Sequence, residues 1–138
     1  FSRKIHLTLG YIHGFLHHYQ SVRKRLRDEL ELLALHSESR IAIYKTDDFA
    51  ELVYLGLKEI GIEEVDVFTS GSPNGSRFLG MPVRDVVVMR PEYYDRVIIG
   101  LLEHTESSCS ELRARGVTSE QLVTLLMGDL REVKGTEQ

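Results

Sequence analysis

The sequence predicts an α/β fold in which a long N-terminal helix precedes a parallel sheet. Two observations lead to this fold class. Apolar residues recur at helical spacing over about the first quarter of the chain, and from residue 40 onward short apolar runs alternate with amphipathic segments. With 138 residues, 42% of them hydrophobic, the chain can bury one domain core. We therefore expect a helix over 1–37 and an α/β domain over 38–138.

The first predicted element is a helix over about 7–35, whose apolar residues are spaced three or four apart. These are Ile12, Phe15, Tyr19, Val22, Leu26, Leu30 and Leu33. Ile12, Tyr19, Leu26 and Leu33 are each seven residues apart, which suits a short coiled coil. The helix either packs on its own domain or pairs two chains and links them to a preceding domain; we favour the second alternative. The basic run at 23–25 is either a nucleic-acid patch or a solvated helix face, which we favour.

The next three elements follow from changes in the hydrophobic period. Arg40–Tyr44 is expected to be a buried strand, and a helix is expected over about 48–60. Asp47 is placed to cap that helix and Gly61 to end it. Val65–Thr69 then reads as the second strand.

The remaining chain predicts shorter elements, separated by turn-forming residues. In order, we expect a loop over 70–77, a short strand over 78–83, a strand or helix at 86–89, a turn into a short helix at 90–92, a strand over 95–100, a helix over 107–115 ended by Gly116, a strand over 122–125 and a loose or helical tail from Met127. Strands that alternate with helices imply a parallel sheet with right-handed crossovers. The expected architecture is thus a small Rossmann-like parallel sheet.

The candidate site lies in the loops that follow the strands, because open α/β sheets bind ligands at the carboxyl ends of their strands. The candidate binding residues are Lys45, Thr46, Asp47, Thr69, Ser70 and Gly100. A dinucleotide site requires glycines in the first loop, and this loop has none. Asp47 and Asp48 would also repel a phosphate there. A nucleotide site built on Lys45 and the serine-rich loop remains one alternative, and a structural turn is the one we favour.

Other reactive residues have simple structural explanations that we prefer. His13 and His17 have the spacing of a metal clamp but are better read as surface histidines. Cys109 is expected to be a packing residue. Asp66 and Asp95 border strands and could be catalytic carboxylates, but we favour an exposed strand-end role for both. We therefore predict no catalytic residue, no metal ligand, no cofactor and no enzymatic activity.

Net charge and hydropathy indicate which partners and which cellular location to expect for the chain. Its formal net charge is −4, which does not favour nucleic-acid binding by the domain as a whole. No apolar run approaches the roughly 18 residues that span a bilayer, so no membrane partner is expected. The single cysteine fits a reducing, cytoplasmic location. Because the chain begins with Phe1 rather than Met, we expect a piece of a longer or processed protein.

Four segments carry a resemblance to known proteins: "IAIYKTDDFAELVYLGLKEIGI", "VDVFTSGSPNGSRFLGMPV", "YDRVIIGLLEH" and "ELRARGVTSEQLVTL". Together they resemble small Rossmann-like domains related to the nucleoside-diphosphate-sugar and CoA-binding families. With the long helix in front, the arrangement resembles the C-terminal module of MarR-like winged-helix transcription regulators of bacteria.

The resemblance implies a non-enzymatic regulatory and oligomerisation module. It would form a homodimer through the N-terminal helix and reach DNA only through a winged-helix domain upstream of Phe1. Its α/β part would either sense a small, nucleotide-like molecule or act only as a dimer scaffold. The alternative is a nucleotide-sugar-, CoA- or NAD-binding fragment or subunit of an enzyme. A third reading is a binding module that presents its helix to another protein.

Overall fold

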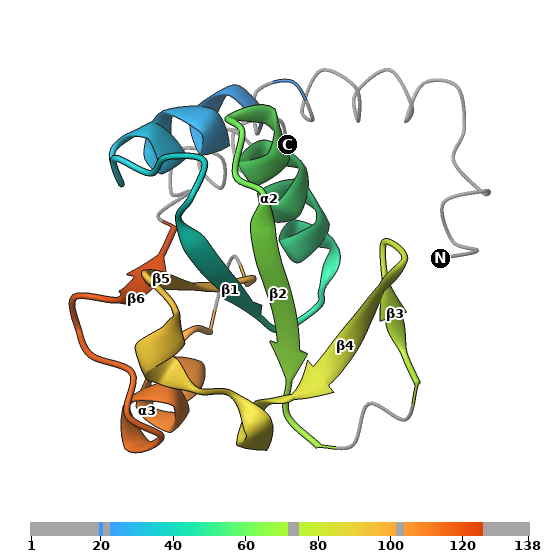
Figure 1. The fold of residues 1–138 in the computed structure, drawn as a ribbon, viewed down its shortest axis with the longest axis vertical. Coiled ribbons are helices and arrows are strands. Elements are labelled where there is room, and N and C mark those ends of the chain that lie inside the picture. Colours follow the sequence, from blue (N-terminus) through green and yellow to red (C-terminus); the bar gives the residue numbers. More distant parts are fainter. Residues whose placement is uncertain (1–19, 21–22, 72–74, 102–103, 126–138) are drawn as a thin grey trace, which may run out of the picture.

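A computed structural model describes residues 20, 23–71, 75–101 and 104–125. In this part the chain forms a six-stranded, mostly parallel sheet with the order β3-β4-β2-β1-β5-β6, flanked by helices (Figure 1). The elements are β1 (Arg40–Tyr44), α2 (Asp48–Glu59), β2 (Glu64–Thr69), β3 (Arg77–Phe78), β4 (Met81–Asp85), the 3-10 helices η2 (Val86–Val88) and η3 (Pro91–Tyr93), β5 (Arg96–Ile99), α3 (Glu106–Ala114) and β6 (Leu122–Thr124). The predicted mixed α/β class with a parallel sheet is confirmed.

The central strand β1 divides the core into two layers. It pairs in parallel with β2 on one side and with β5 on the other, so its backbone is bonded along both edges. Ile41 and Ile43 point to one face of the sheet, and Ala42 and Tyr44 point to the other. All four side chains are completely buried, as expected for a central parallel strand.

On the first face, α2 and a helical segment at 23–31 pack together over the sheet. Leu26 and Leu30 are buried and lie against Gly56 of α2, where an added Cβ would stand 3.0 Å from Leu30 Cδ1. At 23–31 the structure therefore shows the alternative in which the helix packs on its own domain. The predicted seam positions Ile12, Phe15, Tyr19 and Val22 lie outside the described residues.

The helical segment ends before the predicted boundary at 35. Residues 32–34 form a turn, and Ala34 has a left-handed φ of 55° that a helix cannot continue through. Helical periodicity persists in the sequence through Leu33, so the pattern alone places the end too late. Leu33 still packs at the margin of the α2-side core, from the turn rather than from the helix.

On the second face, α3 and the two 3-10 helices cover β1, β5 and the end of β2. The buried residues of this layer include Tyr44, Phe68, Tyr94, Ile99 and Leu112. Tyr94 stacks edge-on against Phe68, with 5.9 Å between ring centroids. The connection from β4 to β5 is made by η2 and η3, so β4 has no long helix beside it within the described residues.

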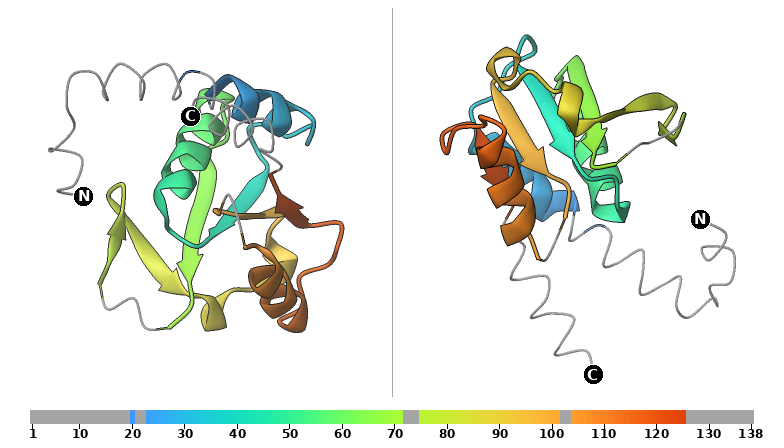
Figure 2. Two further views of the ribbon diagram at one scale, coloured as in Figure 1. Left: turned by 180° about the vertical axis from the view of Figure 1, so that it is seen from behind. Right: turned by 90° about the horizontal axis from the view of Figure 1, so that it is seen from below.

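One predicted strand is wrong. The segment at 78–83 is a hairpin rather than a single strand, because the chain reverses at Leu79 and Gly80, whose φ values are 50° and 88°. Two consecutive left-handed residues make the tight turn that suits twisted antiparallel strands. Figure 2 shows the β3–β4 hairpin extending from the body of the sheet. The turn could not be predicted from the sequence, because leucine rarely adopts a positive φ.

The helix ends are largely as predicted. Gly61 and Gly116 follow α2 and α3 with left-handed φ values of 94° and 106°. Asp47 occupies the N-cap position of α2, but its side chain makes no capping hydrogen bond, so the prediction of a side-chain cap is wrong. Its backbone is extended, and its carbonyl accepts the Ala50 amide at 2.9 Å. The residue itself is exposed to solvent.

Candidate functional site at the carboxyl edge of the sheet

The structure brings three of the predicted loops together beyond the carboxyl ends of β1, β2 and β5. The Lys45 amide donates to the Phe68 carbonyl at 2.8 Å, and the Gly100 amide donates to the Tyr44 carbonyl at 2.8 Å. From β1 the chain passes to β2 on one side, and β5 lies on the other. This is the place where strand order reverses and where open α/β sheets bind their ligands.

Gly100 closes the gap between β1 and β5 at this edge. A Cβ on Gly100 would stand 2.7 Å from Ala50 Cβ and 2.9 Å from the Lys45 carbonyl oxygen. Only glycine permits this approach, because real Cβ contacts are longer than that. Gly100 therefore acts as a packing residue between the start of α2 and the end of β5.

Lys45 occupies a backbone conformation that glycine usually takes. Its φ is 85°, in the left-handed region, and it directly follows β1. Its ammonium group donates to Ser70 Oγ at 3.3 Å and lies 5.0 Å from the centre of the Tyr44 ring. Strain of this kind costs of order 1–3 kcal/mol and persists where the surroundings enforce it.

Acidic side chains surround the N-terminus of α2. Thr46, Asp47 and Asp48 are all exposed there, and Asp48 and Glu51 lie in the first turn of the helix. Carboxylates at this end are stabilised by the helix dipole and compete with any anionic ligand for the same amide groups. Thr69 is half-buried and Ser70 exposed at the neighbouring end of β2.

Sequence reasoning missed Tyr44 and Glu111. The Tyr44 hydroxyl donates to Glu111 Oε1 of α3 at 2.5 Å, and the Arg115 guanidinium lies 3.9 Å from the other oxygen of Glu111. Burial, followed by the hydrogen bond to Glu111, raises the pKa of Tyr44 to about 12; the neighbouring Ser70 acts in the opposite direction. A tyrosine at the end of a buried strand can be expected to place its hydroxyl at the sheet edge. Nothing in the sequence, however, identifies Glu111 as the hydrogen-bond partner of that hydroxyl.

The other polar clusters serve to hold the sheet together. Asp95 accepts the Arg40 amide at 2.8 Å, and Asp66 accepts the Tyr94 hydroxyl at 2.7 Å. Burial and the bond to Asp66 raise the pKa of Tyr94. Both carboxylates thus have structural partners. Asp95 is exposed beside the start of β5, as predicted, whereas Asp66 is half-buried within β2 rather than exposed at its end.

The basic run at the start of the helical segment is balanced by acidic partners. Lys24, Arg25 and Arg27 each lie 3.7–3.8 Å from a carboxylate four residues on. Arg23 pairs with Glu59 of α2. The run is therefore a solvated face with its charge paired, as favoured above.

Within the residues that the structure describes, no group of three or more His, Cys, Asp or Glu could hold a metal ion; His13 and His17 lie outside this part. Cys109 is half-buried and packs against the α3-side core, as predicted. Within the same ranges no helix is long and apolar enough to cross a membrane.

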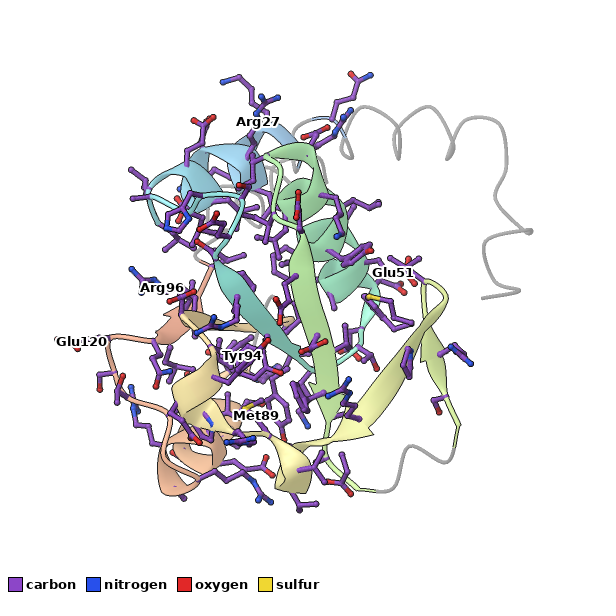
Figure 3. All side chains as sticks on the ribbon, in the orientation of Figure 1. Arg27, Glu51, Met89, Tyr94, Arg96 and Glu120 are labelled. Atoms are coloured by element: carbon purple, nitrogen blue, oxygen red, sulfur yellow. The ribbon has the colours of Figure 1, made fainter. Side chains whose placement is uncertain are left out.

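Figure 3 shows the side chains on the fold, with Tyr94 and Met89 on the α3 side of the sheet and Glu51 on α2 beside the hairpin. Comparison with protein-family models, with curated proteins and with solved structures found no match for this chain.

Proposed function

We propose that this chain is a non-enzymatic regulatory module that responds to a small molecule at the carboxyl edge of its sheet. The observation that carries the proposal is the strained Lys45, whose ammonium group is held beside Ser70 at the place where strand order reverses. Strain retained at such a place is a common mark of a functional residue. Counted along the chain, the five parallel strands β4-β2-β1-β5-β6 lie in the order 3-2-1-4-5, which matches the first five strands of the Rossmann order and supports the finer fold assignment.

The chemistry of the edge supports binding rather than catalysis. Lys45 contacts a hydroxyl and an aromatic ring, and Ser70 has no histidine or carboxylate partner in the described contacts. Activation of a serine nucleophile requires an adjacent base. The Tyr44 hydroxyl, with its raised pKa, remains protonated at neutral pH and serves as a donor.

The alternative is a nucleotide-sugar-, CoA- or NAD-binding part of an enzyme. Lys45, Thr46, Thr69 and Ser70 would then surround a phosphate, with Gly100 beneath it. The one observation in its favour is the Lys45–Ser70 pair. Against it stand the exposed carboxylates of Asp47 and Asp48 at the same helix end.

Thermal unfolding with a panel of NAD, NADP, CoA, S-adenosylmethionine and nucleotide sugars tests the proposal. A ligand at about 100 times its dissociation constant should stabilise the chain by roughly 2.7 kcal/mol, which raises the melting temperature by several degrees. We expect one compound to stabilise the wild type and the Lys58→Ala control but not Lys45→Ala. Stabilisation that survives Lys45→Ala would place the ligand elsewhere, and turnover of the bound compound would favour the enzyme.

We further propose that the chain forms a homodimer through the N-terminal part of its helix, which would join it to a DNA-binding winged-helix domain. Because Leu26 and Leu30 are buried in the domain's own core, the seam would use Ile12, Phe15, Tyr19 and Val22. Sedimentation should give a dimer for the wild type and a monomer for a Phe15→Asp, Tyr19→Asp variant. A wild-type chain that stays monomeric at every concentration would contradict the dimer and support a helix offered to another protein.

A further inference from the structure

The segment 90–94, which contains η3 and leads into β5, lies on the sheet without joining it. The amides of Tyr93 and Tyr94 donate within the segment, to the carbonyls of Arg90 and Pro91 at 2.9 and 3.2 Å. Among the described residues, no backbone–backbone hydrogen bond links this segment to a strand. Its attachment therefore depends on side chains. We refer to residues 90–94 as the strap.

Two tyrosine hydroxyls attach the strap to β2. Tyr93 donates to Glu64, and Tyr94 donates to Asp66 Oδ2 at 2.7 Å. The Tyr94 ring also stacks edge-on against Phe68, which follows Asp66 by two residues and so shares its face of the strand. Hydrogen bonds to an ionised carboxylate are roughly twice as strong as those between neutral groups. The two tyrosines therefore supply much of the attachment.

Arg40 and Gln121 bind the carbonyl groups of the strap. Arg40 Nε donates to the Tyr93 carbonyl at 2.6 Å. Gln121 Nε2 donates to the carbonyls of Pro91 and Tyr94, at 2.7 and 2.8 Å. Arg40 begins β1, and Gln121 directly precedes β6. Side chains from β1 and from the start of β6 thus hold the strap together with the bonds to β2.

The strap covers part of the sheet but buries little of itself. No residue of η3 is buried, and in the strap only Tyr94 is, with 6% of its surface exposed. In contrast, Ala42 and Tyr44 on the same face of the central strand are completely buried. A segment with few buried contacts opens at a lower free energy than the core around it. The strap is therefore poised to open before the sheet does.

We propose that the strap opens from the sheet while the sheet stays folded, with the Tyr94–Asp66 pair as its lock. Opening would uncover Asp66 and Phe68 on the α3 side of β2. The Phe68 carbonyl accepts the Lys45 amide at 2.8 Å, so the uncovered face adjoins the candidate site. The strap is then a gate beside that site. The inference involves no ligand and does not rest on the function proposed above.

Native-state proteolysis of the full chain with chymotrypsin tests the gate. Chymotrypsin accepts a large apolar side chain before the cut bond, so cuts after Tyr93 or Tyr94 report an open strap. When closing is faster than cleavage, the cutting rate follows the population of the open form. Opening of the strap alone exposes little surface. We therefore expect the rate of these cuts, identified by fragment mass, to be nearly independent of urea until global unfolding begins.

Tyr94→Phe tests the lock, because it removes the hydroxyl and keeps both the ring and the cleavage site. We expect the cuts at low urea to become about tenfold faster, the size expected for the loss of one hydrogen bond to a charged group. Tyr54→Phe is the matched control. Tyr54 also stacks edge-on against a phenylalanine, Phe78, but lies on α2. This control should leave the rate unchanged.

Three results would overturn the proposal. The first is a wild-type cutting rate that rises steeply with urea throughout, since the strap would then open only when the whole chain unfolds. The second is an equal rate at low urea for the wild type and Tyr94→Phe. The third is the same acceleration in Tyr94→Phe and Tyr54→Phe, which would indicate a general loss of stability. A negative thermal panel leaves all three results interpretable, because proteolysis uses no ligand.

Discussion

At the scale of single residues, Tyr44 links the core to the candidate site. Its ring is buried on the α3 side of the sheet while its hydroxyl reaches Glu111. A buried hydroxyl left without a partner costs of order 1–3 kcal/mol, so the residue depends on its hydrogen bond. This dependence has a consequence for stability at alkaline pH.

We predict that the free energy of unfolding falls as the pH rises from about 10 to about 12. The pKa of Tyr44 is 10.0 in its ordinary state and about 12 in the folded protein, chiefly because of burial. The folded state therefore keeps the proton after the unfolded state has lost it, and the stabilisation that is complete below pH 10 disappears as the pH passes 12. Urea unfolding at a series of pH values measures this loss.

Tyr44→Phe is the control for that measurement. Removing the titrating hydroxyl should make the alkaline loss shallower, although Tyr94, whose pKa is also raised, continues to contribute. A pH profile identical to that of the wild type would show that Tyr44 ionises equally in both states.

Gly100 gives a second prediction at this scale. Gly100→Ala should destabilise the fold by about 1–3 kcal/mol, because the new methyl group would stand 2.7 Å from Ala50 Cβ. Chemical denaturation measures the change. Adding Ala50→Gly should recover part of the loss despite the lower helix propensity of glycine. If Gly100→Ala left the stability unchanged, the start of α2 would move easily. That result would contradict the close packing of Gly100 against Ala50.

At the scale of elements, the helical segment at 23–31 is part of the domain core. Leu26→Ala should destabilise the chain by about 2–5 kcal/mol, since Leu26 is 1% exposed and packs on α2. Leu32→Ala is the matched control: Leu32 is 78% exposed, and its loss should change stability by less than about 0.5 kcal/mol. Equal effects in thermal unfolding would contradict the packing described here.

The elements also show how far the sequence can predict the fold. Arg40–Tyr44 and α2 follow from hydrophobic period and from Gly61, because both signals are local. The β3–β4 hairpin escaped prediction, since its turn uses Leu79 where glycine or asparagine is usual. The end of the first helix was also not predicted, because Ala34 adopts a left-handed conformation within a helical sequence pattern.

At the scale of the whole molecule, topology made the candidate site predictable only in part. Alternating strands and helices place Lys45, Ser70 and Gly100 at one edge, and the structure brings them together. Glu111 is 67 residues from Tyr44 in sequence, and no periodic pattern reports that contact. Long-range partners of this kind depend on how α3 lies on the sheet, which packing decides.

The central claim is that a small molecule binds at the carboxyl edge, and an amide NMR titration of the full chain tests it most directly. Adding the compounds of the thermal panel one at a time, we expect one of them to shift the resonances of Lys45, Thr46, Ser70 and Gly100. Lys45→Met should abolish these shifts, and Lys58→Met should keep them. Shifts confined to other parts of the sheet, or no shifts with any compound, would contradict the account.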